Sequence, residues 1–208
     1  MIDLEQAKQL WPSTYHGRWM SEEYEPGVVS VIIPTYNREQ LVIEAMDSVW
    51  VQTYRPIELI VVDDGSTDDT SEAVAQWVKG HADDPQFTVR TFSQENRGAP
   101  AARNYGLIES HGEFIQFLDS DDLLFSTKLD RQIASIKKNG GDYTYCKVEY
   151  RNKHDQVTKH ACKPLPSGTG PYLTAHAWKT LSPLFSRKCC LGTGPWDEDL
   201  AAGQQYEH

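Results

Sequence analysis

Short apolar runs recur along the chain, and each is followed by a polar loop and then by an amphipathic stretch. The runs are VVSVII, IELIVV, FTVRTFS and FIQFL, at residues 28–33, 57–62, 87–93 and 114–118. Nearly unbroken runs of β-branched residues, such as the first two, are typical of strands that are covered on both faces. The pattern therefore predicts four strands of a buried sheet.

The amphipathic stretches between these runs predict helices. Asn37 and Gln40 have the spacing of a capping box, and Thr67 is the expected cap of the next helix. Pro100 suits the first turn of a third helix. The four helices are expected at about residues 37–50, 67–79, 100–110 and 126–138.

The later part of the chain has a less regular pattern. Residues 142–150 alternate between apolar and polar side chains, which predicts another strand. Residues 151–181 are polar with scattered Pro and Gly, and we expect a loop-rich insertion or lid without a core of its own. LFSRKCC, at residues 184–190, predicts a last strand, and WDEDLAAGQQYEH at residues 196–208 predicts the start of a helix.

Strands that alternate with helices through short connections predict an α/β fold with a single Rossmann-like, open and mostly parallel sheet flanked by helices. Residues 1–27 hold a short amphipathic stretch and are expected to form an N-terminal arm. Residues 28–208 are expected to form one domain, with halves at 28–123 and 124–208.

The composition is that of a soluble globular protein, since 39% of the 208 residues are apolar and 24% are charged. The formal charge of −10 argues against nucleic acid as a partner, because broad phosphate binding needs clustered Lys and Arg. No stretch approaches the ~20 apolar residues of a membrane span, and the acidic N-terminus does not resemble a signal peptide. A cytoplasmic location is expected, with peripheral membrane association left open.

The cysteines and histidines predict no metal or redox site. None of the four cysteines has CxxC spacing, so reduced thiols are expected at Cys146, Cys162, Cys189 and Cys190. The seven histidines are dispersed, and the close pair His154 and His160 has no third ligand nearby.

The unusual polar clusters all follow predicted strands. PTYN, DDGSTDD, NRGAPAAR and DSDD come after the first, second, third and fourth strand in turn. In open α/β sheets, ligands bind outside the carboxyl ends of the strands, near a switch in strand order. The four clusters therefore predict one shared site.

The DSDD cluster has two interpretations. In an extended segment the side chains of Asp119 and Asp121 would leave the same face, roughly 6 to 7 Å apart along the chain. Carboxylates without Cys or His favour Mg²⁺ or Mn²⁺, and Mg²⁺ typically uses one or two of them together with substrate phosphates. The alternative is a solvated acidic turn that caps a helix.

The NRGAPAAR cluster predicts an anion site. Arg97, Gly98 and Arg103 surround the helix start expected at Pro100, where free backbone N–H groups and guanidinium groups both favour phosphate. The alternative for Arg103 is an ordinary surface arginine on a helix.

Two further loops carry candidate ligand contacts. Tyr36 is placed to stack on a base, although a loop tyrosine also serves simple packing. Asp63 or Asp64 is placed to accept hydrogen bonds from a base or a ribose, or else merely begins a turn.

Taken together, VSVIIPTYNR, ELIVVDDGSTDDT, NRGAPAARNYGL and EFIQFLDSDDLL resemble a glycosyltransferase of family 2 with the type A fold, over about residues 28–140. The resemblance implies a nucleotide-sugar site, to which we assign Pro34, Tyr36, Asp63, Asp64, Arg97, Arg103, Asp119 and Ser120. It also implies a DxD motif that binds the ribose and a Mn²⁺ or Mg²⁺ ion through Asp119, Asp121 and Asp122.

The implied reaction transfers a sugar, with inversion, from a nucleoside diphosphate sugar to an acceptor hydroxyl. A UDP-sugar is the favoured donor, the acceptor is unknown, and polysaccharide or glycoconjugate synthesis is the expected setting. The metal would neutralise charge on the leaving diphosphate, while a base would deprotonate the acceptor.

The expected base is the point where the sequence departs from the family. In GPWDEDLAAGQQYEH the family's acidic pair aligns with Gln204 and Gln205, and an amide does not accept the proton. Either the base was lost or one of the neighbouring acids serves: Asp197, Glu198, Asp199 or Glu207. Family members usually continue beyond this point, so the chain is expected to be part of a longer enzyme.

Three other functions are weighed. The Gln205 departure favours a domain that binds sugar nucleotide with little or no turnover. A haloacid dehalogenase-like phosphatase also has DxD after a strand, but it needs Thr or Val where Leu123 stands. A nucleotidyltransferase would need a glycine-rich phosphate loop after the first strand.

Overall fold

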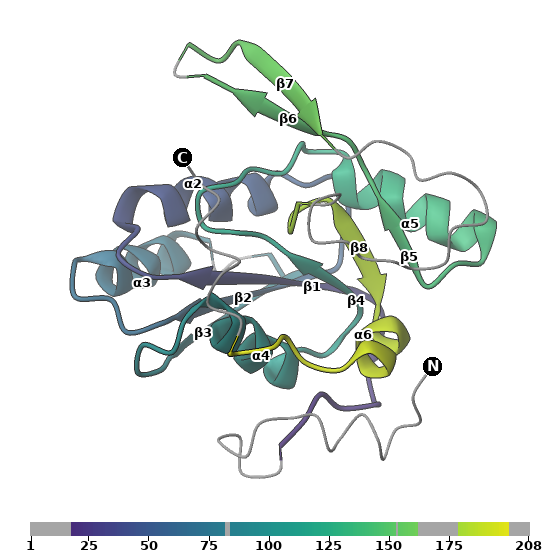
Figure 1. Cartoon of the computed structure of the whole chain (residues 1–208), viewed down its shortest axis with the longest axis horizontal. Coiled ribbons are helices and arrows are strands. Elements are labelled where there is room, and N and C mark those ends of the chain that lie inside the picture. Colours follow the sequence, from purple (N-terminus) through teal and green to yellow (C-terminus); the bar gives the residue numbers. More distant parts are fainter. Residues whose placement is uncertain (1–17, 82–83, 153, 162–178, 200–208) are drawn as a thin grey trace.

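The computed structural model describes residues 18–81, 84–152, 154–161 and 179–199. They form a six-stranded sheet flanked by helices (Figure 1) and a separate two-stranded sheet. The order of the strands is β3-β2-β1-β4-β8-β5. The first four are mutually parallel, whereas β8 runs antiparallel to both β4 and β5. The strands are β1 (Glu25–Thr35), β2 (Ile57–Asp63), β3 (Phe87–Ser93), β4 (Gly112–Phe117), β5 (Tyr143–Tyr145) and β8 (Pro183–Ser186).

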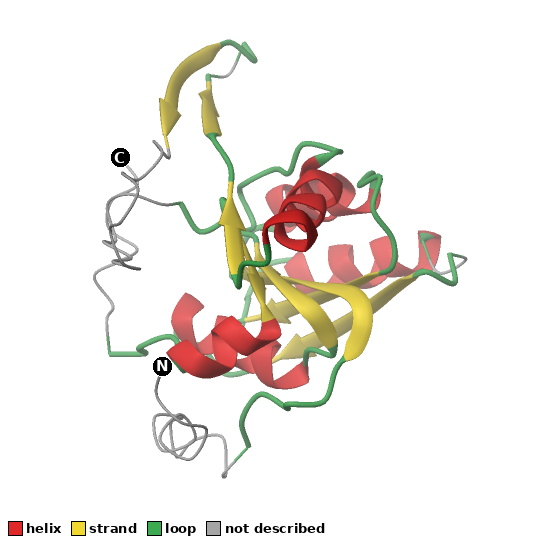
Figure 2. Cartoon of the chain, turned by 90° about the vertical axis from the view of Figure 1, so that its right-hand side faces the viewer, coloured by secondary structure: helices red, strands yellow, loops and turns green. Residues whose placement is uncertain are grey.

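Helices cover both faces of the sheet, as Figures 1 and 2 show. Those of one face pack in a single apolar cluster with Val29, Val31 and Ile33 of β1, and those of the other pack in a second cluster with Ile32. The first face carries α2 (Glu39–Trp50), α3 (Thr70–Gly80) and α5 (Lys128–Asn139), and the second carries α4 (Ala99–Glu109) and α6 (Arg187–Thr193). The predicted α/β class, with a mostly parallel sheet, is confirmed.

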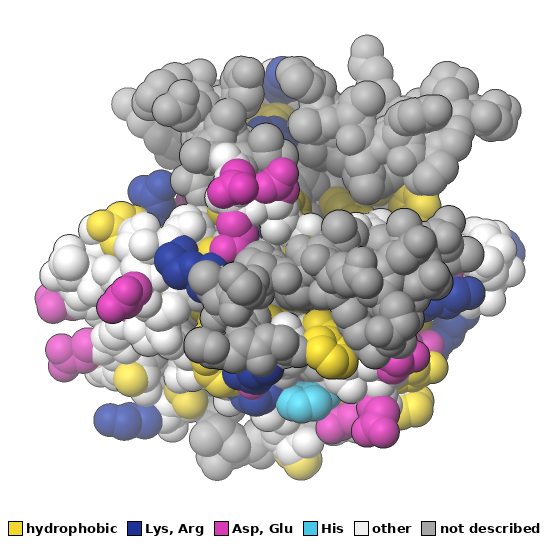
Figure 3. All heavy atoms as spheres, turned by 60° about the horizontal axis from the view of Figure 1, so that its bottom comes forward, with side chains coloured by type: hydrophobic (Ala, Val, Ile, Leu, Met, Phe, Trp, Pro, Cys, Tyr) yellow, Lys and Arg dark blue, Asp and Glu magenta, His cyan; other side chains and the backbone are white. Residues whose placement is uncertain are grey.

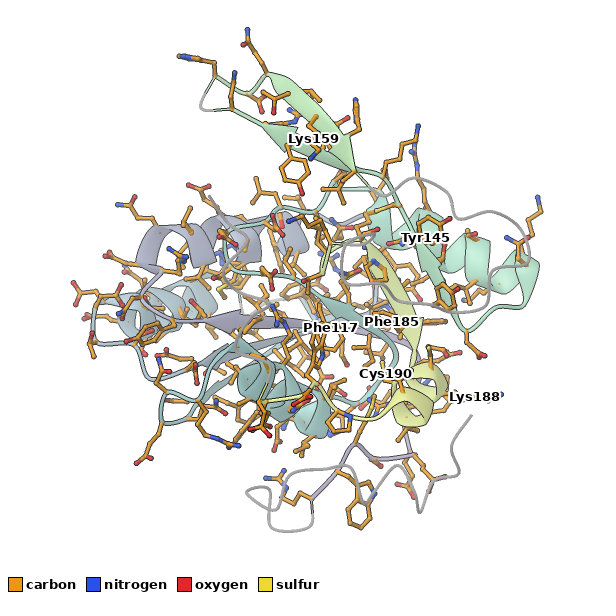
Figure 4. All side chains as sticks on the ribbon, viewed as in Figure 1. Phe117, Tyr145, Lys159, Phe185, Lys188 and Cys190 are labelled. Carbon is orange, nitrogen blue, oxygen red and sulfur yellow. The ribbon has the colours of Figure 1, made fainter. Side chains whose placement is uncertain are left out.

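Burial on both faces explains the unbroken apolar runs. Val29, Val31 and Ile33 point to one helical layer, and Ile32 between them points to the other, with none of the four exposed to solvent. On the α4 side, Phe117 of β4 and Phe185 of β8 lie close together in Figure 4, with ring centroids 6.4 Å apart. A strand covered in this way has no face that is exposed to solvent.

Gly106 allows α4 to approach the centre of the sheet closely. A Cβ atom on this residue would lie 2.4 Å from Cγ2 of Ile32 in β1, which is a direct clash. The close approach places the start of α4 beside the carboxyl ends of β1 and β2, where the Gly98 N–H donates to Asp64.

The segment 142–150 forms two strands instead of the single strand that its alternation predicts. β5 ends at Tyr145, and β6 (Val148–Arg151) belongs to a separate two-stranded sheet with β7 (Val157–Ala161). Ser182 explains the break, because its hydroxyl accepts from the Cys146 N–H at 3.3 Å and donates to the Cys146 carbonyl at 2.7 Å. The β6–β7 hairpin projects from the body (Figure 2), so the insertion is not entirely loop.

The segment LFSRKCC is only partly a strand. β8 ends at Ser186, whose side chain accepts from the Cys189 N–H at 3.1 Å and caps α6. The prediction of a strand through residue 190 was therefore wrong, because a serine cap converts the following residues to helix. Arg187 is buried at the start of α6 and donates to the Gly112 carbonyl and to the Ser110 hydroxyl.

Other boundaries differ by a few residues. β1 begins at Glu25, whose N–H donates to the His111 carbonyl at 2.8 Å, so the last residues of the predicted arm belong to the sheet. α3 begins at Thr70 rather than at Thr67. Cys146, Cys189 and Cys190 are free thiols, whereas Cys162 lies outside the described residues.

One face of the described residues has mixed charge. On the face that Figure 3 shows, Lys and Arg side chains are dispersed among acidic ones. Among the described helices, none is long and apolar enough to cross a membrane.

Lys128, at the start of α5, is buried in a polar network. Its ammonium group donates to the side-chain oxygens of Gln116 on β4 and Gln132 on α5. The amide nitrogens of the two glutamines donate in turn to the Leu181 and Ser182 carbonyls, each at 3.0 Å. Burial lowers the pKa of Lys128 to about 7, because neutral amides replace the water that would stabilise its charge.

This lysine makes the free energy of unfolding depend on pH. The pKa of Lys128 lies near 7 in the folded chain and near 10.5 in an unfolded one, so between these values the unfolded state binds more protons. We expect the free energy of unfolding to rise from about pH 7.5 to about pH 9.5, by up to about 1.4 kcal/mol per pH unit. Urea denaturation at the two pH values measures the change.

Lys128→Met provides the control, because it removes the titrating group and keeps a long side chain. For each protein the free energy of unfolding is plotted against pH. The difference between the two slopes gives the contribution of Lys128, because the other groups that titrate in this range are present in both proteins. Equal slopes would show that Lys128 does not cause the pH dependence of the free energy of unfolding.

Candidate functional site

The polar loops that follow β1, β2, β3 and β4 lie at one edge of the sheet, as the sequence predicts. The order of the strands reverses between β1 and β4, because β2 and β3 lie on one side of β1 and β4 on the other. Such a switch point leaves a crevice outside the carboxyl ends of the strands. The candidate residues from all four loops are therefore brought to one region.

Asp64, which follows β2, orders the loop after β3. One carboxylate oxygen accepts from the Gln94 amide at 2.7 Å and from the Arg97 N–H at 2.9 Å, and the other accepts from the Gly98 N–H at 2.7 Å. Asp64 is buried, so these donors compensate for its lost hydration. Contact between Asp64 and a base stays a prediction, and three of its roughly four acceptor sites are filled by the protein.

Asp63 shapes the turn that precedes α3. It accepts from both the N–H and the hydroxyl of Ser66, at 3.0 and 2.5 Å, and from the Ser71 hydroxyl. Gly65 lies against the neighbouring loop, where an added Cβ would be 2.9 Å from the Asn96 nitrogen, and its φ is +80°. Glycine is required here by both the backbone conformation and the close approach of the loops.

Asn37 connects the loops after β1 and β2 and does not cap α2. Its N–H donates to the Ser66 hydroxyl at 2.9 Å, and its side-chain oxygen accepts from the Thr67 N–H at 2.8 Å. The predicted capping box is wrong, because α2 begins at Glu39 and Asn37 has a φ of +51°. Asparagine tolerates this left-handed conformation better than most residues. The residue type at position 37 is therefore the signal in the sequence for the positive φ.

Arg103 and Asp119 form an ion pair between α4 and the loop after β4. The guanidinium Nη2 lies 2.5 Å from a carboxylate oxygen of Asp119. The guanidinium carbon also lies 4.7 Å from the ring centroid of Trp196, so a cation–π contact holds the other side. Arg103 is therefore a buried arginine of the site and not a surface residue.

The DSDD segment forms a turn, and the expectation of an extended segment is wrong. The Asp122 N–H donates to the Asp119 carbonyl at 3.0 Å, which folds the four residues back on themselves. Within the turn Ser120 is buried, Asp122 is half-buried and Asp121 is exposed. The aspartates are thus gathered at one point without the spacing of a strand.

The fit of this turn to a divalent cation depends on further ligands. Within the described ranges, no group of three or more His, Cys, Asp or Glu residues could hold a metal ion. Asp119 and Asp121 offer hard oxygen donors, and Arg103 contacts one oxygen of Asp119. This donor set suits Mg²⁺ or Mn²⁺ when a diphosphate supplies the remaining oxygens.

Of the candidate bases, Glu198 is engaged by the protein. Its two carboxylate oxygens accept from Arg97 Nη2 at 2.5 Å and from the side-chain amide of Asn104 at 2.9 Å. Asp197 and Asp199 are exposed. Gln204, Gln205 and Glu207 lie outside the described residues, and so does most of the helix predicted there.

Three buried polar atoms of the described residues lack a hydrogen-bond partner, and all belong to this edge. They are Oγ1 of Thr35 at the end of β1, Oε1 of Gln94 after β3, and Nε of Arg103. A buried polar atom without a partner costs about 1–3 kcal/mol, so such atoms call for an explanation. A polar ligand at this edge would provide one.

Pro34 and Tyr36 lie at the end of β1. Pro34 belongs to the strand, whereas Tyr36 is in the loop and exposes 46% of its surface. An exposed tyrosine beside this edge suits the predicted stacking on a base, which stays a prediction.

Comparison with known proteins gives the family. The model described as glycosyl transferase family 2 matches residues 30–199. The chain belongs to glycosyl transferase family 2. Membership decides against the phosphatase and nucleotidyltransferase alternatives.

Relatives of this family 2 chain are named glycosyltransferases. Over 129 residues it is 40% identical to an uncharacterized glycosyltransferase of Rickettsia felis, which covers 61% of this chain and 20% of that protein. Over 132 residues it is 37% identical to WfgD of Escherichia coli, named a UDP-Glc:alpha-D-GlcNAc-diphosphoundecaprenol beta-1,3-glucosyltransferase, covering 64% of this chain and 50% of that protein. The chain thus matches half or less of the length of these two relatives.

Solved structures give the same fold. The crystal structure of S. aureus TarS superposes with a TM-score of 0.68 at 25% identity, over 85% of this chain and 32% of that one. TarS 1-349 in complex with UDP has a TM-score of 0.63 at 26% identity, over 84% and 52%. The mannosyltransferase PcManGT of Pyrobaculum calidifontis, at 23% identity and a TM-score of 0.62, shares the fold. The predicted type A glycosyltransferase fold is confirmed.

Asp64→Asn tests the loop-ordering role of this carboxylate. The variant keeps one acceptor oxygen but places an NH₂ group against backbone N–H donors. We expect the free energy of unfolding to fall by about 2 kcal/mol, as for the loss of charge-assisted hydrogen bonds at a buried site. Urea denaturation measures the change.

Asp69→Asn is the matched control, because Asp69 is exposed and its side chain makes no capping bond to α3. Its free energy of unfolding should stay within about 0.5 kcal/mol of the wild type. A similar loss in both variants would argue that Asp64 has no special role in ordering residues 94–98.

Proposed function

We propose that this family 2 domain transfers a sugar, with inversion, from a nucleoside diphosphate sugar to an acceptor hydroxyl in polysaccharide or glycoconjugate synthesis. The observation that carries the proposal is the Arg103–Asp119 pair at the switch point of the sheet, beside the start of α4. A guanidinium group and a carboxylate turn at that position suit a diphosphate and a cation respectively.

A UDP-sugar is the favoured donor. TarS 1-349 has been solved with UDP, and with UDP-GlcNAc at 32% identity to this chain, and the name of WfgD includes UDP-Glc. In this chain Tyr36 would stack on the base, while the unpartnered Thr35 and Gln94 atoms would contact the nucleoside. These contacts support the binding of a nucleotide without fixing the sugar.

Asp119 and Asp121 would hold a Mn²⁺ or Mg²⁺ ion together with oxygens of the donor diphosphate, whereas the predicted third ligand, Asp122, does not complete a group of three ligands in the described residues. Such an ion neutralises the charge that develops on a leaving diphosphate. Arg103 adds a positive charge on the α4 side, and the Trp196 ring holds its guanidinium in place. The site residues would thus orient the diphosphate and stabilise its departure.

The base would come from the end of the chain. Asp197 and Asp199 are exposed, and Glu207 follows in the sequence, whereas Glu198 is already bound by Arg97 and Asn104. A second candidate function remains: a domain that binds sugar nucleotide with little turnover. The amide at Gln205, in place of the family's expected acid, favours this second function.

Asp121→Ala tests the cation site. Asp121 is exposed in the DSDD turn, so its loss should leave the fold unchanged while a metal ligand is removed. We expect wild-type UDP affinity to be greater with Mn²⁺ than with EDTA by about tenfold or more, and we expect this difference to vanish in the variant. Titration calorimetry measures both affinities.

Asp130→Ala is the matched control, because Asp130 is an exposed aspartate on α5 away from the turn. It should keep the Mn²⁺ dependence of the wild type. Asp119→Ala is less suitable, since it would also break the pair with Arg103. A Mn²⁺ dependence that survives Asp121→Ala would remove the metal assignment.

Alanine variants at Asp197, Glu198, Asp199 and Glu207 test the source of the base. If the domain is catalytic, at least one of these variants should release UDP from UDP-sugars about 100-fold or more slowly than the wild type. A loss of this size is typical when a general base is removed. Calorimetry with UDP should show unchanged affinity in the variant that loses the base.

Gln205→Glu separates the two functions. A wild-type chain that binds UDP without turnover, and gains turnover in this variant, would favour the binding domain whose base was lost. Full turnover in all four alanine variants would exclude this end of the chain from the mechanism.

A further inference from the structure

Asn104 holds the segment around Trp196 by two backbone hydrogen bonds. Its side-chain oxygen accepts from the Trp196 N–H at 2.7 Å, and its side-chain nitrogen donates to the Trp196 carbonyl at 2.9 Å. Asn104 lies in α4 and is fully buried, and the two residues are 92 positions apart in the sequence. The side-chain amide of Asn104 thus bonds both backbone groups of Trp196, as the backbone of a neighbouring strand would.

Glu198 also binds Asn104, and it connects this asparagine to Arg97. One of its oxygens accepts from the Asn104 amide nitrogen at 2.9 Å and the other from Arg97 at 2.5 Å. Arg97 precedes α4 and Asn104 lies within it, so the carboxylate spans the start of the helix. We call the four residues Arg97, Asn104, Trp196 and Glu198 the latch.

The chemistry of the latch requires an asparagine. The Trp196 carbonyl and the Glu198 carboxylate only accept hydrogen bonds, so the NH₂ group of Asn104 must face them. The amide oxygen must then face the Trp196 N–H, which fixes the orientation of the side chain. Aspartate would repel both acceptors, and leucine would leave all three groups without their partner.

The latch is connected to the arginine of the candidate site through a single ring. The Trp196 indole lies 4.7 Å from the guanidinium carbon of Arg103, and it meets the Phe117 ring edge-on at 5.2 Å. The other side of Arg103 contacts Asp119. A ring whose backbone is fixed therefore limits the orientations open to the guanidinium group.

We propose that Asn104 is a positioning residue, which holds Trp196 over Arg103 and so keeps the guanidinium group aimed at the donor diphosphate. The proposal rests on the proposed function, in which Arg103 binds that diphosphate. It gives Glu198 a role in the latch instead of the role of a base.

Hydrogen exchange tests the contacts of the latch without any ligand. The Trp196 amide should exchange slowly in the wild type and about tenfold faster or more in Asn104→Ala, because its acceptor is lost. Asn139→Ala is the matched control, since Asn139 is exposed at the end of α5. Unchanged exchange at Trp196 in Asn104→Ala would overturn the latch.

Donor binding tests the positioning role. We expect Asn104→Ala to weaken UDP binding in the presence of Mn²⁺ by about tenfold, with Asn139→Ala unchanged. Trp196→Ala should have the same effect, because it removes the ring and keeps the backbone groups that Asn104 binds. If Asn104 acts through the ring, the double variant should be no weaker than either single variant.

The outcomes separate a positioning role from a structural one. Fast exchange at Trp196 together with wild-type UDP affinity in Asn104→Ala would show that the latch only stabilises the chain. Wild-type affinity in Trp196→Ala would also overturn the proposal, and this variant provides the test if Asn104→Ala does not fold. Additive losses in the double variant would show that the two residues act separately, which contradicts it.

Failure of the proposed function gives a different result. A wild-type chain that binds no UDP, with or without Mn²⁺, would overturn both the donor assignment and the role of Arg103 in it. Wild-type UDP binding that is unaffected by Asn104→Ala would overturn the positioning role alone.

Discussion

The burial of the Asp64 carboxylate at the edge of the sheet constrains the rest of the site. A carboxylate that has lost its hydration must find donors, and Asp64 finds the Gln94 amide and the N–H groups of Arg97 and Gly98. These bonds place the loop after β3 and therefore the first turn of α4. Arg103 and Asn104 lie in this helix and Arg97 lies in the loop before it, so one buried acid helps to place the basic groups of the site.

The end of the described chain returns to the same helix. β8 runs antiparallel beside β4, Ser186 caps α6, and buried Arg187 attaches α6 to the end of β4 that is opposite the site. The following residues then reach the start of α4, where Asn104 and Arg97 bind them. α4 and the residue before it thus join Trp196 and Glu198 to the earlier part of the chain.

The two arginines of the site are paired with carboxylates, but the hydrogen bonding of the site is incomplete. Arg97 is paired with Glu198, 101 positions away, and Arg103 with Asp119, 16 positions away. Nevertheless Thr35, Gln94 and Arg103 each retain a buried polar atom without a partner among the described residues. A ligand that contacted these atoms would gain hydrogen bonds at side chains that the protein already holds in place, which would reduce the reorganisation that binding requires.

The sequence by itself determined the parallel core, the approximate helices and the shared edge, because the hydrophobic period and the polar clusters after strands are local signals. Only the tertiary structure decided the partners of the polar side chains. Asp64 and Gly98 are 34 positions apart, and Asn104 and Glu198 are 94 apart. Nothing local in WDED says that Glu198 faces a buried asparagine, or in DSDD that the segment turns back on itself. Hydrogen bonds follow three-dimensional proximity, and folding alone creates that proximity.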